Sequence, residues 1–129
     1  MTNPTQDGQR ADGSVTMEVS NAMVALYKDL FGRGPTKTRT SYAGADTILV
    51  TLENSLTQSE QNLAALNEHG RLRDIRMLFQ HSSEKDFTEV IERITGRKVR
   101  AFVSGIDTRR DVSSEVFYLE PNGDVPSDV

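Results

Sequence analysis

The hydrophobic pattern of the chain begins with one amphipathic helix. Between about Thr16 and Phe31, apolar residues recur at steps of three and four and form a single stripe. The helix is expected to stop at Gly32 and at Gly34-Pro35, because glycine accepts the left-handed cap conformation and proline cannot continue the helical ladder. The stripe consists of Val19, Met23, Leu26, Tyr27 and Leu30.

A pattern of period two follows and predicts a β-hairpin. Thr36 to Tyr42 alternates β-branched or aromatic residues with lysine, arginine and serine. Ala43 to Asp46 supplies turn residues, and Thr47 to Glu53 is the more apolar strand. The inner face of that strand is predicted to carry Ile48, Val50 and Leu52.

A second helix is predicted from Leu56 to about His81. Thr57 and Glu60 have the spacing of a capping box, in which each residue satisfies a free backbone amide at the start of a helix. Gly70 interrupts the helix at a cost of about 1 kcal/mol relative to alanine. The apolar positions of this helix are Leu63, Leu66, Leu72, Ile75, Leu78 and Phe79.

The last part of the chain predicts a third helix and a second pair of strands. The helix is expected to begin at Ser83 and to end at Gly96, with a stripe at three- and four-residue spacing. The strands are predicted at Val99 to Val103 and Glu115 to Glu120, with a long polar loop from Asp107 to Ser114. The stripe consists of Phe87, Val90, Ile91 and Ile94.

The order helix, glycine stop and hairpin occurs twice. The stripes of the first and third helices match at one constant offset, and Gly32-Arg33 matches Gly96-Arg97 at the same offset. The second strands of both hairpins also agree in phase. This agreement favours an internal duplication of a helix–hairpin unit with the second helix inserted between the copies, and chance is the alternative because few residues are identical.

These elements predict a two-layer α+β fold, with a four-stranded antiparallel sheet from two hairpins and three helices on one face. The other face is expected to meet water or a partner. It is predicted to carry Lys37, Arg39, Ser41, Thr51, Arg100 and Tyr118. The predicted core consists of Met23, Leu26, Leu30, Ile48, Val50, Leu52, Leu63, Ile75, Phe79, Phe87, Ile91, Ile94, Val99, Phe117 and Leu119.

Composition limits the architecture to one domain. The 129 residues are enough for a single core without staples. Residues 15–121 form the predicted domain, and residues 1–14 and 122–129 are predicted to be disordered because they are almost free of apolar side chains. The absence of cysteine excludes disulfides and leaves the compartment open, with the cytoplasm as the default. No apolar run reaches the roughly 18 residues of a membrane span, so no direct membrane insertion is expected.

Arginine residues flank both glycine stops at equivalent positions of the two copies. Arg33, Arg39, Arg97 and Arg100 could therefore converge on one anion-binding surface. The favoured interpretation is that edge strands carry Lys and Arg to block pairing with other sheets. The net charge of −4 gives no general attraction to nucleic acid.

The sequence shows no catalytic constellation and predicts no metal site and no cofactor. His69 and His81 lack ligand spacing, and the glycine stop lacks the ending of a phosphate loop. Asp46, Asp107 and Asp111 fall in predicted turns, where Asp commonly bonds the local backbone. The protein is therefore not expected to be an enzyme.

Several short motifs within residues 15–121 carry a family resemblance. They are Gly32-x-Gly34-Pro35, Leu56-Thr57-x-x-Glu60, Arg76, Thr95-Gly96 and Asp107. On these residues the chain resembles the MpsC-like family, formerly grouped as a domain of unknown function and named for a subunit of a sodium-translocating, membrane-potential-generating system in bacteria. The first strand is more polar here than the family's usual valine-rich version.

The resemblance implies a small soluble bacterial protein that serves as an accessory subunit of a membrane complex for cation or inorganic-carbon transport. The expected partner is a protein, and a homodimer is the expected form of self-association. The alternative function is a small-ligand or anion-binding regulatory domain that uses the arginine clusters. The resemblance brings no catalytic residues with it.

Overall fold

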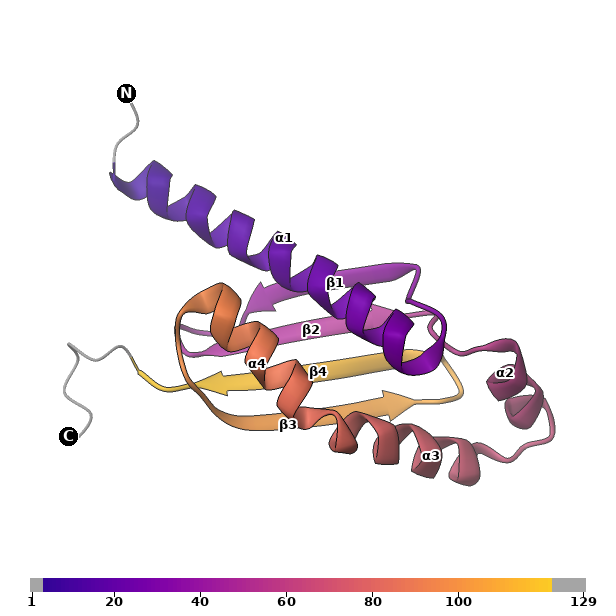
Figure 1. Cartoon of the computed structure of the whole chain (residues 1–129). Helices are drawn as coiled ribbons and strands as arrows, with labels where there is room; N and C mark the ends of the chain where they lie inside the picture. The colour runs from indigo at the N-terminus through magenta and orange to yellow at the C-terminus, as the bar shows by residue number, and fades with distance from the viewer. Residues whose placement is uncertain (1–3, 122–129) are drawn as a thin grey trace.

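The computed structural model describes residues 4–121, and it describes their side chains from residue 13 onward. Residues 4–121 form four helices and four strands (Figure 1). In chain order they are α1 (Pro4–Phe31), β1 (Lys37–Tyr42), β2 (Thr47–Glu53), α2 (Gln58–Ala65), α3 (His69–Ser82), α4 (Glu84–Thr95), β3 (Val99–Asp107) and β4 (Val112–Leu119).

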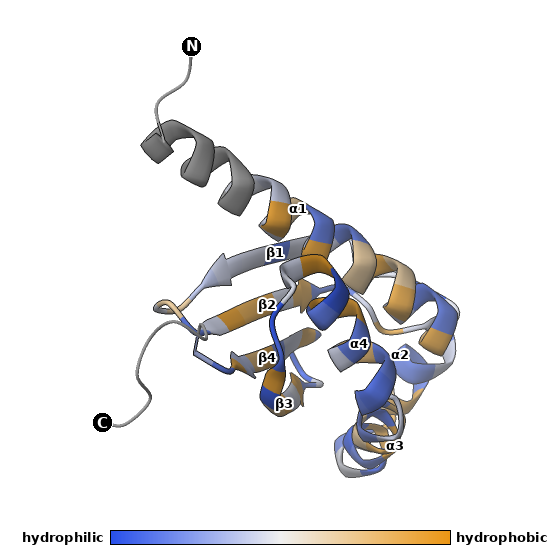
Figure 2. Cartoon of the chain, turned by 60° about the vertical axis from the view of Figure 1, so that its left-hand side comes forward, coloured by the Kyte–Doolittle hydropathy of each residue, from blue (hydrophilic) through white to orange (hydrophobic). Residues whose placement is uncertain are grey.

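The four strands form one antiparallel sheet in the order β1-β2-β4-β3. β2 and β4 are therefore central, and β1 and β3 are the edges. The helices cover one face, while the opposite face carries no described helix (Figure 2). The α+β class and the four-stranded antiparallel sheet are confirmed; the internal duplication stays a prediction.

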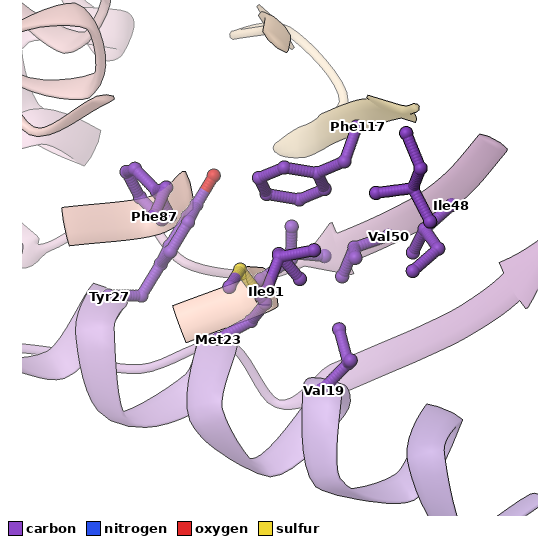
Figure 3. Packing of buried hydrophobic residues seen from close by; sticks show 10 residues of the cluster. Val19, Met23, Tyr27, Ile48, Val50, Phe87, Ile91 and Phe117 are labelled. Carbon is purple, nitrogen blue, oxygen red and sulfur yellow. The ribbon is translucent and has the colours of Figure 1, made fainter. Parts of the chain in front are cut away.

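Helices α1 and α4 form the main core against the two central strands. Figure 3 shows Met23 and Tyr27 of α1 and Ile91 of α4 meeting Val50 of β2 and Phe117 of β4. All five side chains are fully buried. The predicted core members on α1, α4 and the strands are confirmed, although some are only partly buried. The partly buried ones are Leu26, Leu30, Ile94 and Val99. Leu63 of α2 is also partly buried but lies outside this cluster.

The sheet face without helices is mixed in polarity. Leu49, Val116 and Val103 stand opposite one another on β2, β4 and β3, and they form a short apolar row. Val103, on the edge strand, is 54% exposed. Lys37 and Arg39 on the opposite edge are also exposed, as expected for an edge strand that resists pairing with other sheets.

The predicted second helix is two helices, which corrects the expected count of three. The helix is interrupted at Asn67, which has a φ of 61° and follows Leu66, the C-cap residue of α2. Asparagine adopts this left-handed conformation more readily than most residues. Gly70, the predicted point of interruption, instead lies within the first turn of α3.

The second pair of strands is longer than predicted. β3 runs to Asp107 and β4 begins at Val112, so the connecting loop spans only residues 108–111. The Asp107 carboxylate accepts hydrogen bonds from the backbone amides of Arg109 and Arg110, which tightens the turn. The polarity of this run predicts a loop, but polar residues such as Ser113 belong to β4 and are buried within the sheet.

The first helix begins at Pro4 and not near Thr16. Residues 4–14, predicted to be disordered, are thus helical in the structure. Extension is inexpensive once a helix is nucleated, because each added residue contributes one hydrogen bond. The rest of the predicted tails, residues 1–3 and 122–129, lies outside the described residues.

Candidate functional site around helix α3

Helix α3 is oriented with its polar residues inward and its apolar residues outward. Arg76 and Gln80 are fully buried one turn apart. Ile75, Leu78 and Phe79 are 43%, 63% and 45% exposed, respectively. The prediction that Ile75 and Phe79 belong to the core is wrong, because the sheet beneath α3 presents polar groups that require polar partners.

The Arg76 guanidinium holds α3 to the start of α2. Its Nε and Nη2 atoms donate to the two carboxylate oxygens of Glu60 at 2.6 and 2.7 Å. Nη2 also donates to the carbonyl of Ser55 at 2.8 Å, and the guanidinium lies 3.6 Å from the centre of the Phe31 ring. This bidentate pair fixes the position of a cation that is completely removed from solvent.

Glu60 has a second role in the same place. The hydroxyl of Thr57 accepts from the amide of Glu60, and the carboxylate of Glu60 accepts from the amide of Thr57 at 2.8 Å. Burial raises the pKa of Glu60, but the hydrogen bonds from Arg76 and Thr57 outweigh burial and hold the pKa below its ordinary value. The capping box is therefore also the anchor point for α3.

A second buried network joins α3 to the sheet and to α1. Gln80 Nε2 donates to the hydroxyl of Ser104 on β3, and it donates to Glu115 Oε2 on β4 at 3.0 Å. The hydroxyl of Tyr27 on α1 donates to the same Oε2 atom. Three elements that are far apart in sequence therefore meet at one carboxyl group, and that group is fully buried.

Burial controls the ionisation of this network. Burial raises the pKa of Glu115 to about 7, against the lowering effect of hydrogen bonds with Ser104, Tyr27 and Gln80. Burial also raises the pKa of Tyr27 well above its ordinary value, and the nearby Glu115 charge adds to that increase. Tyr27 therefore acts only as a neutral hydrogen-bond donor, whereas Glu115 can change charge near neutral pH.

The outer stripe of α3 is continuous with an acidic cleft. The Phe79 ring packs edge-on against Phe31 at 6.3 Å, and Phe31 directly follows the α1 residues that line the cleft. The cleft has a volume of about 230 Å³ and combines an apolar floor with two carboxylates. Its lining residues are Leu26, Asp29, Leu30, Ser83, Asp86 and Phe87.

The four arginines of the predicted anion site do not come together. Arg33 donates to the carbonyl of Leu56 beyond the end of β2, whereas Arg97 contacts Ala45 and Asp46 just before β2 begins. Seven residues of strand separate these two ends, a distance of about 20 Å. The predicted single patch is therefore not formed.

The other two arginines lie on opposite edges of the sheet. Arg39 is on β1, and Arg100 is on β3, where it stacks 5.5 Å from the Tyr118 ring. The sheet order places β2 and β4 between them. Both side chains are exposed, so whether either binds an anion stays a prediction.

The glycines and the proline that were predicted to end helices help to position the site. Gly32 and Gly96 have φ values of 81° and 70° at the ends of α1 and α4. A β-carbon on Gly34 would lie 3.2 Å from Val24, so the chain passes close to α1 before Pro35 leads into β1. These turns bring the end of α1, with Phe31, next to α3.

Asp111 fixes the loop between β2 and α2. Its carboxylate oxygens accept from the amides of Ser55 and Leu56 at 2.9 and 3.2 Å. Asp46 pairs with Arg97, and Asp107 bonds its own turn. All three predicted turn aspartates therefore have structural partners.

A second, polar cleft lies where α3 begins. His69 Nδ1 is 2.9 Å from the hydroxyl of Thr108, while His81 lies at the other end of the helix. The cleft has a volume of about 380 Å³. It is lined by His69, Gly70, Arg73, Ile106, Asp107, Thr108 and Arg109.

Sequence reasoning missed the buried polar residues beneath α3. The apolar stripe at Ile75, Leu78 and Phe79 is intact but faces outward. Arg76 and Gln80 lie on the opposite face of the helix, where the stripe gives no signal that they are buried. Glu115 was detectable, since it shares its strand face with Phe117 and Leu119 at period two. A carboxylate on a predicted inner face requires a buried partner, and that requirement was the available signal.

Comparison with known proteins gives a family and one curated relative. The family model described as "Na+-translocating membrane potential-generating system (MpsC)" matches residues 11–121. The uncharacterized protein YbcI of Bacillus subtilis (strain 168) is 29% identical over 113 residues, which cover 86% of this chain and 90% of the relative. No solved structure matches. Among the described residues, no helix is both long and apolar enough to cross a membrane.

Proposed function

The chain belongs to the MpsC family, and we propose that it is a non-enzymatic accessory subunit that binds another protein of a membrane-potential-generating Na+ system through helix α3. The observation that carries the proposal is the outward apolar stripe of α3. An isolated exposed leucine is ordinary, but three large apolar side chains on one helical face beside a cleft are typical of a docking surface.

The proposed occupant is a cytoplasmic segment of a membrane subunit with apolar residues next to Lys or Arg. The cleft beside the stripe carries Asp29 and Asp86, and no described residue forms a salt bridge with either. The net charge of −4 adds to this preference for a basic partner. Loops on the cytoplasmic side of membrane proteins are enriched in Lys and Arg, so their chemistry complements the cleft.

Co-purification with membrane subunits encoded beside its gene tests this role. Leu78→Glu should reduce recovery of the complex at least about tenfold, because it places a charge in an apolar contact. Met17→Glu is the matched control, since Met17 is 67% exposed on the first half of α1 and away from α3. Equal recovery of both variants would contradict docking on α3.

Two further results would redirect the proposal. If Leu78→Glu converts a dimer to a monomer in light scattering but leaves the membrane complex intact, the stripe is a contact between two copies of this chain. If the protein alone catalyses a reaction that is lost on changing Asp107 or His81, the non-enzymatic role is wrong.

The polar cleft at the start of α3 favours a second candidate function, an anion-binding regulator. His69, Arg73 and Arg109 line it, in place of the four arginines predicted from the sequence. Titration with inorganic phosphate by calorimetry should show binding that Arg73→Gln weakens and that Arg93→Gln, on the exposed face of α4, leaves unchanged. Absence of heat beyond dilution would remove this candidate.

A further inference from the structure

The Glu115 carboxyl and the Gln80 carboxamide share a single hydrogen bond, although each group has a second polar atom. Gln80 Nε2 donates to Glu115 Oε2 at 3.0 Å. The remaining oxygens, Glu115 Oε1 and Gln80 Oε1, are both buried and have no hydrogen-bond partner among the described residues. Both oxygens are acceptors when Glu115 is ionised, so neither can satisfy the other.

The charged groups around Glu115 do not neutralise it. The charge of Arg76 on α3 acts to lower the pKa of Glu115, but Glu60 of α2 already holds Arg76 in a bidentate pair. Tyr27 of α1 and Ser104 of β3 contribute neutral hydroxyls, and Val50 of β2 stands directly opposite Glu115. The neighbour from α4 is Phe87, which packs on Tyr27. A buried carboxylate without its own counter-charge is costly, and uptake of a cation relieves that cost.

We propose that Glu115 Oε1 is a proton-binding site and that the bound proton closes a cyclic acid–amide pair with Gln80 Oε1. In this state the carboxyl donates through Oε1 to the carboxamide oxygen and accepts through Oε2 from the carboxamide nitrogen. The proton is taken from bulk water and returned to it, so no other reactant is needed. Release of the proton leaves two acceptor oxygens together and weakens the attachment of α3.

The electrostatics place this change in the neutral range. Burial raises the pKa of Glu115 to about 7, so the carboxyl is protonated at pH 6 and mostly ionised at pH 8. The proton changes how α3 is attached to the sheet, whether or not a protein is docked on the helix.

The direction of the pH effect follows from the two states. Between the ordinary pKa of 4.5 and about 7, the folded protein keeps a proton that the unfolded chain has lost. The folded-to-unfolded ratio should therefore fall about tenfold for each pH unit in this range and become level above it.

Replacement of Glu115 by glutamine tests the proposal. Glu115→Gln provides a permanent N–H donor toward Gln80 Oε1 and so imitates the protonated state. Urea unfolding between pH 5 and 8.5 should show a fall in the wild-type midpoint with rising pH and a nearly constant midpoint in Glu115→Gln. The exposed Glu18→Gln is the matched control and should follow the wild type. Equal pH dependence in Glu115→Gln and the wild type would overturn the proposal.

A measurement on the wild type keeps the proposal testable if the variant does not fold. The ¹³C signal of the Glu115 side-chain carboxyl should titrate near pH 7, and amide exchange in residues 72–82 should increase at higher pH beyond its intrinsic pH dependence. A carboxyl that titrates near pH 4.5 would contradict a proton site. Stabilisation at pH 8.5 by NaCl but not by equal choline chloride would show a metal-cation site in place of a proton site.

Discussion

Helices α3 and α4 are neighbours in the chain and lie on the same side of the sheet, but they are attached by opposite chemistry. α4 buries Phe87 and Ile91, and both belong to the apolar core. α3 buries one leucine together with Arg76 and Gln80, each held by directed hydrogen bonds. Apolar burial fixes a helix without regard to pH, whereas polar attachment is directional and responds to charge.

The difference also explains which helix has apolar side chains exposed at the surface, where a partner could bind. The stripe of α4 is used in the core, so its outer face is polar. The inner face of α3 is polar, so Ile75, Leu78 and Phe79 remain available at the surface. The helix that is attached by polar contacts is therefore the one able to dock.

The apolar attachment should give the largest effect on stability. Ile91→Ala should lower the free energy of unfolding by about 2–5 kcal/mol, because Ile91 is fully buried and the cavity can collapse only partly. Urea unfolding measures this change, which should be the same at pH 5.5 and pH 8. An unchanged denaturation midpoint would show that α4 does not pack as described.

Removal of the buried cation should give the next largest effect. Arg76→Met leaves Glu60 and the Ser55 carbonyl without their donor, and we expect a loss of about 3 kcal/mol. The estimate is at the low end for a broken buried pair because the Glu60 side chain is 14% exposed.

A double-mutant cycle sharpens this result. Adding Glu60→Gln to Arg76→Met should recover part of the loss, since the remaining partner is then uncharged. If the two single losses simply add, the ion pair is not what holds α3. The Glu60 contribution should be present above its ordinary pKa of 4.5 and lost as pH falls through its lowered pKa.

Loss of the helix cap should have a smaller effect. Thr57→Ala removes the hydroxyl that accepts from the Glu60 amide, and we expect a loss of about 1 kcal/mol. Thr57→Ser keeps the acceptor and should restore most of the stability. A loss from Thr57→Ala comparable with that of Arg76→Met would mean that the capping box, and not the cation, anchors α3.

The outer stripe should have the smallest effect of all. Leu78→Ser should change the free energy of unfolding by less than about 0.5 kcal/mol, because Leu78 is 63% exposed. The comparison with Ile91→Ala in the same thermal or urea assay tests the orientation of α3 directly. A loss of several kcal/mol would place Leu78 in a core.

The same contrast separates what could be predicted from the sequence from what could not. The stripe of α4 and the strand faces at Ile48, Val50 and Phe117 follow the rule that apolar residues turn inward. The capping box follows from the spacing of Thr57 and Glu60 alone. α3 obeys the opposite rule, and its apolar stripe taken alone gives the wrong face. The deciding fact is Glu115 on the opposing strand, which no local pattern of α3 contains.

Two other predictions are also wrong. The helix is interrupted at Asn67, which adopts the left-handed conformation, and not at Gly70. The arginine patch does not form because Arg33 and Arg97 lie at opposite ends of β2, while Arg39 and Arg100 lie on opposite edges of the sheet. Of the candidate site, Thr57 and Glu60 were predicted as a capping box and Tyr27 as part of an apolar stripe. The buried polar contacts of Arg76, Gln80 and Tyr27 were not predicted.

The junction between α3 and α4 has a mechanical consequence. Ser83 is both the C-cap residue of α3 and the N-cap residue of α4, and its side chain makes no N-capping hydrogen bond. α3 has 14 residues and is thus a stiff arm about 21 Å long, joined at one end to a helix that is immobilised in the core. A pivot of only about 10° at Ser83 would displace the far end of the arm by roughly 4 Å over that length. A small loosening beneath Gln80 would in this way be amplified at His69, at the other end of α3 from the pivot.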